Sequence, residues 1–538
     1  MTASLPDAIA GLLRPEAYPH AADTVELLET HISWVLLAGD YAYKIKRPVS
    51  YSFIDLTSLD RRRFFCEEEL RLNRRFAPEL YLEVCRVVAC AGSVTMQGGA
   101  AEAEGTREYA VKMHRFAAAE ELDRLIGAHG IEPHELESFG RALAQIHARL
   151  PVAPPESKWG RPADIQAQLI GNLLECAQAA AVFGTSQDIL ALQGPLQERL
   201  PASAVWMMAR RANGRVRECH GDLHCRNLVR IRGRLIAFDC LEYEPAFRWI
   251  DVADEIAFLS SDLKARGQPL HAQAFRGGYL AENGDYHACR VLELYEAHRA
   301  LVRAKIAAIS AMPNEDESRR HALRREHGRL VEVAAHALVA KAPRLVLMSG
   351  LSGSGKTWLA RQLAERLSAV HIRSDVERKR RAGLHELASS HARLGEGIYS
   401  GVASAEVYEG LARAAEDVLS GGISVIIDAT FLRRAQRTRF VELAETSGVP
   451  LRLIECEAPE PVLRARILER SRAQRDASEA DLKVLDWQLA HLEALSPEEQ
   501  IEAIRVDTAR PDSLGRTLQW IGTAASSRHH ARELSQRE

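Results

Sequence analysis

Short runs of alternating apolar and polar residues near the start of the chain predict β-strands. Together with one helix, the expected elements are strands at 24–29, 34–38 and 41–47, a helix at 58–76, and further strands at 82–89 and 108–115. Gly39-Asp40 provides a hairpin turn between the second and third strands. Helical spacing of apolar residues then dominates 117–150 and 163–183, so this part of the chain is predicted to combine a sheet with helices.

The pattern changes twice further along the chain. Residues 216–238 are expected to form loops and strands, and residues 250–342 to be almost wholly helical, with one Pro/Asn/Asp interruption at 313–316. Beyond Pro343, short apolar runs alternate with helical segments, and the expected strands are 345–348, 370–373, 423–427 and 451–455. Such alternation predicts a doubly wound parallel sheet. We therefore expect two domains, at 1–342 and 343–522, followed by a short disordered tail at 523–538.

Composition narrows the classes of function. The chain has 538 residues, too many for one core, and a formal net charge of −3, so no global field recruits nucleic acid or an anionic membrane. Its nine cysteines contain no C-x-x-C pair and are expected to be reduced thiols. We expect a cytoplasmic protein without a secretory signal or a membrane segment. The adjacent His529 and His530 are expected to be surface residues, not metal ligands.

Residues 350–357 complete the phosphate-loop pattern G-x-x-x-x-G-K-[ST], directly after an apolar strand. Glycines let backbone N–H groups converge on phosphate oxygens, while a lysine neutralises their charge and a hydroxyl binds Mg²⁺. The residues expected to bind ATP are Gly350, Ser352, Gly353, Ser354, Gly355, Lys356 and Thr357, and Thr357 is also a metal ligand. Asp428, at the end of the strand 423–427, is the candidate second acid at the metal. Asp375 follows the second strand, at the sheet edge where substrates bind.

A second phosphotransfer pattern lies upstream, where residues 220–227 are His-Gly-Asp-Leu-His-Cys-Arg-Asn. Transfer of a phosphoryl group to a hydroxyl needs a carboxylate that accepts the proton, together with oxygen ligands for Mg²⁺. Asp222 supplies the first, and Asn227 with Asp239, at the end of a later strand, supplies the second. The spacing from Asp222 to Asn227 equals that of H-R-D-x-x-x-x-N in protein kinases.

With its H-G-D-x-H-x-x-N sequence, this region resembles the aminoglycoside phosphotransferase and choline kinase branch of the kinase fold. The resemblance implies an α+β, bilobal protein-kinase-like domain in which Lys44 meets the α/β-phosphates, with Lys46 as the runner-up. An acid from the next helix should pair with Lys44, and we expect Glu68 in preference to Glu67.

A G-x-G-x-x-G loop is missing between the first two strands of this domain. Phosphate contacts there would fall to backbone N–H groups and to the hydroxyls of Thr30 and Ser33. His220 and His224 are expected to hold the catalytic loop in shape, rather than to take part in the chemistry.

The C-terminal half resembles the small P-loop kinases that include gluconate kinase, polynucleotide 5′-hydroxyl kinase and zeta-toxin kinases. That resemblance implies that Asp375 acts as a base towards the acceptor. It also implies a lid whose arginines close on the transferring phosphate, and the candidates are Arg464, Arg470, Arg472 and Arg475. From residue 18 to about 520, the chain resembles a bacterial family of bifunctional aminoglycoside-phosphotransferase-like/ATP-binding proteins.

Taken together, the two patterns favour a kinase with two Mg-ATP sites that phosphorylates hydroxyl groups of small molecules. ATP and Mg²⁺ are the expected cofactors, and Asp222, Asp375 and Lys356 the expected catalytic residues. One alternative is a regulatory protein in which the N-terminal half is a nucleotide-sensing pseudokinase. Another is a nucleic-acid 5′-hydroxyl kinase, which would need a basic groove beside Asp375. The sequence predicts neither the acceptors nor the oligomeric state.

Overall fold

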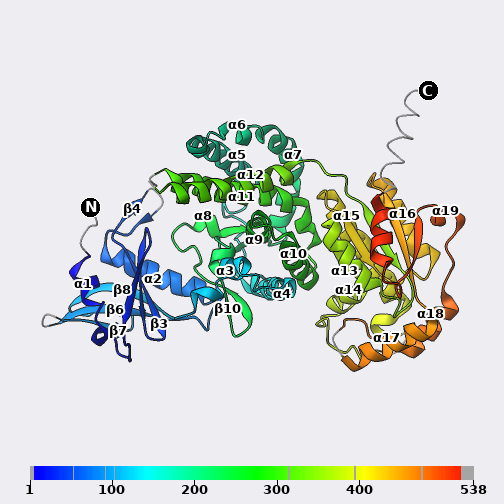
Figure 1. The fold of residues 1–538 in the computed structure, drawn as a ribbon, viewed down its shortest axis with the longest axis horizontal. Coiled ribbons are helices and arrows are strands. Elements are labelled where there is room, and N and C mark those ends of the chain that lie inside the picture. Colours follow the sequence, from blue (N-terminus) through cyan, green and yellow to red (C-terminus); the bar gives the residue numbers. More distant parts are fainter. Residues whose placement is uncertain are drawn as a thin grey trace. The chain divides into compact units, whose positions relative to one another are not determined.

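The computed structural model describes residues 5–51, 54–90, 93–101, 103–312, 316–392, 396–473 and 476–522 (Figure 1). The chain divides into two compact units. Unit 1 comprises 1–139, 145–169 and 207–263, and unit 2 comprises 140–144, 170–206 and 264–538. The predicted tail and the pair His529-His530 lie outside the described residues. The expected domain boundary at 342/343 stays a prediction.

Unit 1 is built on a six-stranded antiparallel sheet in the order β1-β2-β3-β8-β6-β7. Its strands are β1 (Val25–Glu29), β2 (Ser33–Ala38), β3 (Tyr41–Lys46), β6 (Tyr81–Cys90), β7 (Ser93–Gly98) and β8 (Thr106–His114). Five of them lie where alternation predicts strands, and β7 alone of the six was not predicted. Short elements flank the sheet, namely α1 (Asp7–Gly11) and the hairpin β4 (Ser50–Tyr51) and β5 (Ile54–Asp55).

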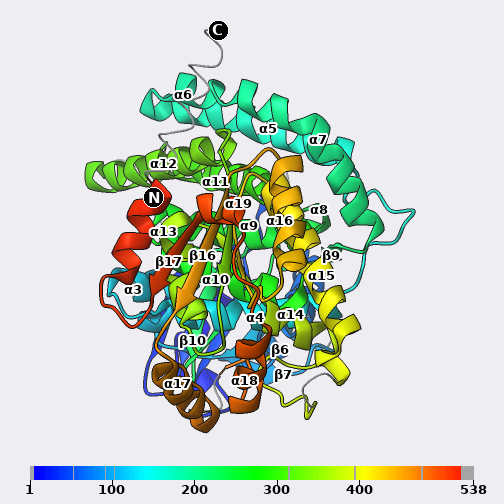
Figure 2. The ribbon, with the colours of Figure 1, turned by 90° about the vertical axis from the view of Figure 1, so that its right-hand side faces the viewer.

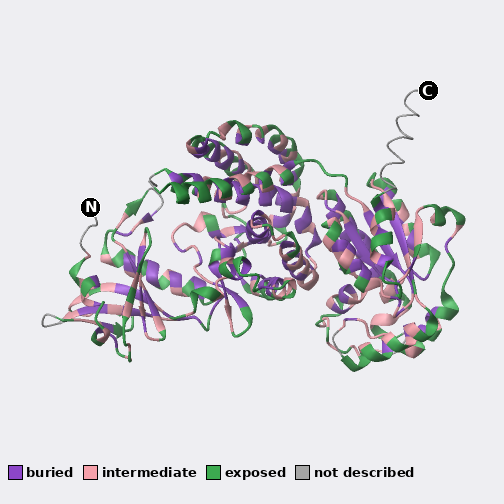
Figure 3. Cartoon of the chain, in the orientation of Figure 1, coloured by how far each residue is buried: buried purple, intermediate pink, exposed green. Residues whose placement is uncertain are grey.

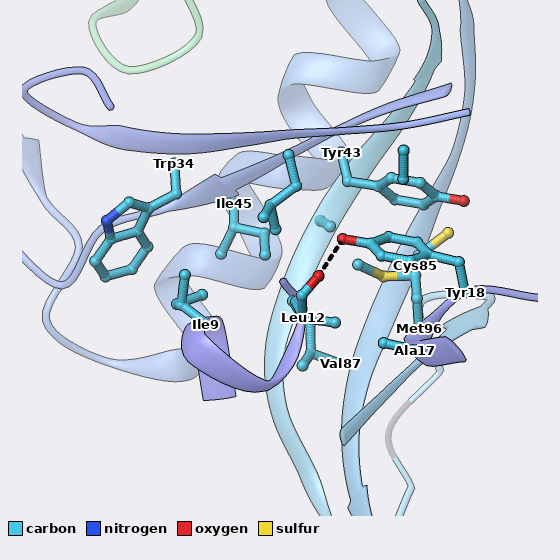
Figure 4. Packing of buried hydrophobic residues seen from close by; sticks show 13 residues of the cluster. Ile9, Leu12, Ala17, Tyr18, Trp34, Tyr43, Ile45, Cys85, Val87 and Met96 are labelled. Atoms are coloured by element: carbon cyan, nitrogen blue, oxygen red, sulfur yellow. Dashed lines mark hydrogen bonds between the residues drawn. The ribbon is translucent and has the colours of Figure 1, made fainter. Parts of the chain in front are cut away.

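The two faces of this sheet are covered differently. One face packs on residues that precede β1, and Figure 4 shows Tyr18, whose hydroxyl donates to the Leu12 carbonyl, beside Tyr43 of β3. The other face packs on α2 (Leu59–Asn73), which begins at an N-cap serine, Ser58. Because side chains alternate along a strand, Lys44 and Lys46 point to the α2 side while Tyr43 and Ile45 point away from it.

The rest of unit 1 carries the loop at 220–227 between short strands. These strands are β9 (Val216–Glu218), β10 (Leu228–Ile231), β11 (Arg234–Ala237) and β12 (Trp249–Asp251). The antiparallel hairpin of β10 and β11 follows the loop at once and brings residue 239 back beside it. The helices of this region are α3 (Leu122–Gly127), α8 (Pro245–Arg248) and α9 (Val252–Ala265). The last two residues of α9 belong to unit 2, and three further helices contribute residues to both units, namely α4 (Pro133–Arg149), α5 (Pro162–Ala179) and α7 (Gln193–Ala212).

Unit 2 begins with helices. They are α6 (Ser186–Leu190), α10 (Pro269–Asn283), α11 (Cys289–Ala311) and α12 (Glu317–Leu338). Alanines on α11, among them Ala308 and Ala311, meet Phe183 and Ala179 in a small apolar cluster. The Pro/Asn/Asp interruption predicted at 313–316 falls mostly outside the described residues.

The remainder of unit 2 is a five-stranded, wholly parallel sheet in the order β14-β15-β13-β16-β17. Its strands are β13 (Leu345–Ser349), β14 (Val370–Arg373), β15 (Val425–Asp428), β16 (Leu451–Glu457) and β17 (Ala503–Asp507). The first four lie where the apolar runs predict them. Both faces of β13 and β15 are buried, as the purple strands of Figure 3 show, which explains their unbroken apolar sequences.

Helices cover both faces of this sheet (Figure 2). The helices of this part of the chain are α13 (Lys356–Leu367), α14 (Ser374–Arg381), α15 (Gly401–Ser420), α16 (Arg434–Thr446), α17 (Glu460–Ala473), α18 (Leu482–His491) and α19 (Pro497–Ile501). Leu359 and Leu363 of α13 pack on Val346 and Met348 of β13. Right-handed crossovers in this strand order put α13 on one face and α15 and α16 on the other. The predicted doubly wound arrangement is therefore present.

Two further features are the state of the cysteines and the apolar character of the helices. Every cysteine whose side chain the structure describes is buried and free of disulfide bonds. No helix in the described ranges combines the length and the apolar character that crossing a bilayer requires.

Two candidate phosphotransfer sites

The first candidate site lies in unit 1, around two lysines of β3. The Nζ atom of Lys44 lies 2.5 Å from Oδ1 of Asp239 and 2.9 Å from Oε1 of Glu69. Lys46 forms ion pairs with Glu69 and with Glu242. The side chains of Lys46 and Glu69 are fully buried. These two lysines and three carboxylates thus form one connected network of ion pairs.

The acid that pairs with Lys44 is Glu69, so the expectation of Glu68 is wrong. Glu68 instead pairs with Arg71 at 2.8 Å and lies 3.7 Å from Arg248. The buried stripe of α2 passes through Phe65, Cys66, Glu69 and Leu72. Glu68 and Glu69 both lie three or four residues from Phe65 and from Leu72, so these two apolar residues do not decide which glutamate is buried. Cys66 lies three residues before Glu69 on the buried face, and its position favours Glu69 as the buried glutamate.

In this network, ion pairing outweighs burial in setting the pKa values of the two lysines. Burial by itself lowers the pKa of Lys44, but the carboxylates of Asp239, Glu69 and Glu242 outweigh it and raise that pKa well above the ordinary value. For Lys46 the same balance of burial against Glu242 and Glu69 gives a pKa of about 12. Burial opposes ionisation of Asp239, yet Lys44 lowers its pKa. Both lysines are therefore firmly charged.

The loop at 220–227 brings the predicted carboxylate and amide together. The Nδ2 atom of Asn227 donates to Oδ2 of Asp222 at 3.0 Å and to its carbonyl at 2.9 Å. His224 Nε2 lies 3.3 Å from the same carboxylate. Asp239 follows β11 in the left-handed region at φ 63°, a conformation that is unusual for an L-residue but is tolerated by Asp. Asp222 and Asp239 keep side-chain exposures of 36% and 44%, so both remain accessible.

Buried contacts hold this loop in place. Glu255 of α9 accepts hydrogen bonds from the backbone N–H groups of His220 at 2.7 Å and Gly221 at 3.1 Å. A side chain at Gly221, whose φ is +86°, would lie 2.9 Å from the Phe247 carbonyl oxygen. His220 contacts the Phe238 carbonyl at 2.9 Å, and burial lowers its pKa to about 4. His220 is thus neutral and structural in this setting.

The turn between β1 and β2 is closed on itself. The backbone N–H of Thr30 donates to the Ser33 carbonyl at 2.9 Å, and the N–H of Ser33 donates to the Thr30 hydroxyl at 2.9 Å. Ser33 is fully buried. The Thr30 hydroxyl and the N–H groups of Thr30 and Ser33 are therefore engaged within the turn, while the Ser33 hydroxyl is buried and has no hydrogen-bond partner among the described residues.

The second candidate site is the phosphate loop of unit 2. Gly350, Gly353 and Gly355 have φ values of 135°, 80° and 80°, which L-residues rarely adopt. A side chain at Gly355 would lie 2.7 Å from the Thr508 hydroxyl. The Ser354 hydroxyl is buried and has no hydrogen-bond partner within the described residues. The loop thus has the backbone shape and the free polar group that suit an anionic ligand.

Lysine and metal-site residues gather at the carboxyl end of this sheet. Lys356 donates to the Leu351 carbonyl at 2.9 Å, and burial lowers its pKa despite the nearby Asp428. The Thr357 hydroxyl donates to Oδ2 of Asp428 at 2.7 Å, as a shared metal site requires. His371, 3.2 Å from the same oxygen, is a neighbour that the sequence did not single out.

Asp375 lies in the first turn of α14, and its surroundings are tightly held. Arg373, two residues earlier, donates to Asp476 at 2.9 Å. Two residues later, Glu377 is buried, accepts from the Tyr286 hydroxyl at 2.9 Å and pairs with Arg380. The helix that carries the candidate base is thereby anchored within unit 2 to the segment between α10 and α11.

Two of the predicted lid arginines, Arg464 and Arg470, have separate partners within the protein, and the lid itself stays a prediction. Arg464 pairs with Glu460 at 2.8 Å and with Asp486 at 2.5 Å. Arg470 donates to the Ala480 carbonyl at 2.8 Å, and Arg475 lies outside the described residues.

Two residues that the sequence motifs did not indicate, Arg466 and Gln488, contact the phosphate loop. Arg466 donates to the Gly353 carbonyl at 3.2 Å and to the Thr508 hydroxyl at 2.9 Å, while Gln488 accepts from the Ser352 N–H at 2.8 Å. Arg466 lies one helical turn before Arg470 in an arginine-rich helix, so the sequence does not distinguish it from the arginines that were predicted.

The donor sets of both sites suit Mg²⁺. Asp239 and Asn227 offer oxygen ligands in the first site, and Thr357 and Asp428 in the second. Among the described residues, no group of three or more His, Cys, Asp or Glu side chains is arranged to hold a metal by itself. Mg²⁺ is ordinarily bound by one or two carboxylates with water and substrate phosphates, so such a cage is not needed.

Sequence comparison finds a matching family model for each of two regions. Residues 61–292 match the phosphotransferase enzyme family, and residues 345–495 match the AAA domain. Among curated proteins, uncharacterized proteins of Mycobacterium bovis and Mycobacterium tuberculosis are 27% identical over 492 residues, which is 90% of this chain and 93% of theirs. These relatives therefore share both regions in one chain.

Similar solved structures fall into two groups. An aminoglycoside phosphotransferase from Alicyclobacillus acidocaldarius is 14% identical and covers 63% of this chain and 95% of its own, with a TM-score of 0.37. A gluconokinase from Sinorhizobium meliloti is 20% identical and covers 36% of this chain and 98% of its own, with a TM-score of 0.26. A sugar kinase from Janibacter sp. is 24% identical and covers 34% and 95%, with a TM-score of 0.25.

The family matches confirm the predicted architecture. A kinase-like phosphotransferase region of the aminoglycoside phosphotransferase type precedes a P-loop region with a parallel sheet. The chain therefore contains a region of the phosphotransferase type followed by a P-loop region.

Proposed function

We propose that the chain is an ATP-dependent phosphotransferase with two separate Mg-ATP sites, each transferring a phosphoryl group to a hydroxyl of a small molecule in the cytoplasm. The observation that carries the proposal is the juxtaposition of Asp222, Asn227 and Asp239 with a charged Lys44, in a chain that also has a complete phosphate loop. Mg-ATP would supply the transferable phosphoryl group and the metal charge that neutralises its oxygens.

In the first site, Asp222 would orient an acceptor hydroxyl and take its proton. Its carboxylate is held by Asn227 and His224 but stays 36% exposed, so a hydroxyl can reach it. Asp239 and Asn227 would hold the metal, and Lys44 would neutralise phosphate charge while Glu69 keeps it in position.

In the second site, binding and chemistry fall to different elements. Backbone N–H groups of the phosphate loop, with Lys356, would hold the phosphates, and Thr357 with Asp428 would hold the metal. Asp375, on the anchored helix α14, would accept the proton of the acceptor.

The regulatory alternative has one observation in its favour, which is the closed turn between β1 and β2. Because Thr30 and Ser33 bond to each other, that turn offers few groups to the phosphates. A nucleotide-sensing pseudokinase would tolerate this loss better than an enzyme. The nucleic-acid alternative gains no such support, since Arg373 and Lys379 beside Asp375 are paired with Asp476 and Glu479.

The proposal is tested by identifying what the full chain phosphorylates. Terminally labelled ATP is incubated with small-molecule and RNA fractions of a cell extract and with Lys356→Ala, Asp222→Asn or both changes. We expect labelled small molecules, one set lost with Lys356→Ala and another lost with Asp222→Asn, while the exposed Lys483→Ala loses neither.

Three results would contradict this function in distinct ways. Label in the RNA fraction alone would establish the nucleic-acid alternative. No labelled product from the Lys356→Ala protein, with Mg-ATP still bound and no effect of adding Asp222→Asn, would establish the regulatory one. Label that persists in the double variant would exclude both assigned sites.

A further inference from the structure

A cavity of about 810 Å³ lies in unit 2, away from the phosphate loop. Its walls come from the α9–α10 connection, from α12, from the end of α13, and from the segments just before β13 and β15. Those segments mark the amino-terminal edge of the parallel sheet. The phosphate loop, Asp375 and Asp428 follow strands at the opposite edge, so the cavity is separate from the nucleotide site.

Cationic side chains dominate the cavity wall. Six lysines and arginines line it against two glutamates, an excess of four positive charges, and the six are Lys264, Arg276, Arg329, Lys341, Arg344 and Arg366. The chain as a whole has a net charge of −3. This concentration is therefore local and is not a consequence of overall composition.

Two acids that pair with wall cations, Glu293 in the wall and Glu296 outside the lining, are each shared between cations. Glu296 pairs with Lys264 at 2.6 Å and with Arg276 at 3.3 Å. Glu293 pairs with Lys341 and lies 3.7 Å from Arg199. Burial lowers the pKa of Lys264, and the charge of Arg276 lowers it further while Glu296 opposes the change. Even with these glutamates, the cavity wall carries more positive than negative charge.

Two arginines face the cavity without a carboxylate partner. No ion pair within the described ranges involves Arg329 of α12 or Arg366 of α13, and both are exposed. Arg366 lies in the last turn of its helix, where a cation also stabilises the helix dipole. Arg329 lies in mid-helix and has no such explanation.

We propose that this cavity binds a small molecule that carries at least two phosphate groups. Each phosphate brings up to two negative charges, so two of them match the excess on the wall. The volume is within the ~300–1,000 Å³ that small-molecule sites occupy. Glu332 and Glu293 would accept hydrogen bonds from hydroxyls of the same ligand, as on a phosphorylated sugar or a nucleotide.

Isothermal titration calorimetry tests the site on the full chain carrying Lys356→Ala, without Mg²⁺. The probes are tripolyphosphate, fructose 1,6-bisphosphate, ATP and inorganic phosphate. Lys44 is held by carboxylates in the first site and should not attract these anions without the metal. We expect the polyphosphorylated probes to bind at least tenfold more tightly than inorganic phosphate, and ATP or the bisphosphate to exceed tripolyphosphate if hydroxyls contribute.

Matched variants decide whether the cavity is responsible. Adding Arg329→Ala with Arg366→Ala should weaken binding at least tenfold, whereas Arg325→Ala, an exposed arginine one turn earlier on α12, should change it less than twofold. Unchanged thermal unfolding confirms that the variants fold. Absence of binding, an unchanged affinity in the double variant, or an equal loss with Arg325→Ala would overturn the proposal.

Discussion

The lysines of the two candidate sites, Lys44 and Lys356, lie in opposite electrostatic environments. Lys44 contacts the carboxylates of Asp239 and Glu69, which raise its pKa well above the ordinary value in spite of burial. Among the described residues, Lys356 donates to the Leu351 carbonyl at 2.9 Å and to no carboxylate, and burial lowers its pKa. In the first site, the protein supplies the negative charge itself.

This difference predicts how much each lysine gains from a nucleotide. A phosphate that reaches Lys44 must compete with carboxylates already in place, so the net gain is small. A phosphate that reaches Lys356 relieves the cost of a buried charge that lacks an anionic partner. The phosphate loop should therefore depend on its lysine for binding, and the kinase-like site should use its lysine mainly to position reacting groups.

The largest effect concerns chemistry in the phosphate-loop site, where binding and proton acceptance are separable. Asp375→Asn keeps the size of the side chain but removes the base, so acceptor phosphorylation should fall by about 10²- to 10⁴-fold while ATP binding persists. Steady-state kinetics with the identified acceptor measures this, with the exposed Asp512→Asn as the control. Loss of nucleotide binding would instead assign Asp375 a structural or metal role.

The comparison between the lysines is tested directly by truncating each. Lys356→Ala should weaken ATP binding at its site by about 10²- to 10³-fold, because removing that charge deletes a preorganised phosphate contact. Lys44→Ala should weaken ATP binding at the other site by only about tenfold, since the lysine gives up two carboxylates to meet the phosphate. Equilibrium binding of a fluorescent ATP analogue gives both values. Equal losses would break the comparison.

The buried network around Lys44 predicts a difference in stability between adjacent glutamates. Glu69→Gln leaves Lys46 and Lys44 short of a buried counter-charge and should lower the free energy of unfolding by about 3 kcal/mol. Glu68→Gln breaks a pair nearer the surface and should cost about 1 kcal/mol or less. Hydrogen exchange of β3 in increasing urea reports these values. A larger effect at Glu68 would restore the original assignment.

The smallest effect concerns the anchor of α14. Tyr286→Phe removes the hydroxyl that donates to the buried Glu377, a loss of about 1 kcal/mol at a site that only positions Asp375. Turnover at the phosphate-loop site should fall about fivefold, with the KM for ATP unchanged. An increase in that KM with unchanged turnover would show that the contact serves nucleotide binding instead.

Residues close together in sequence were predictable because their spacing carries the chemistry. The phosphate loop, the run from His220 to Asn227 and the ends of the parallel strands all depend on local order. The loop residues Asp222 and Asn227 meet at 3.0 Å, as their spacing implies. Thr357 and Asp428 meet at 2.7 Å because parallel strands end at the same edge.

Long-range pairs and weak strands were not predictable in this way. Glu242 meets Lys46 across 196 positions, and Tyr286 meets Glu377 across 91, so no local pattern marks either pair. The choice between Glu68 and Glu69 depends on one step of helix rotation within a run of three glutamates. Strand β17 contains Arg505 between apolar residues and lies at the sheet edge, where an apolar run is not required.

The central claim, that the chain holds two independent Mg-ATP sites, is tested most directly by the binding stoichiometry. Isothermal titration of the full chain with a non-hydrolysable ATP analogue and Mg²⁺ should give two sites per chain. Lys356→Ala and Asp239→Ala should each leave one site, and the two remaining sites should differ in affinity. A single site that disappears with either change, or one that Asp239→Ala leaves untouched, would contradict the account.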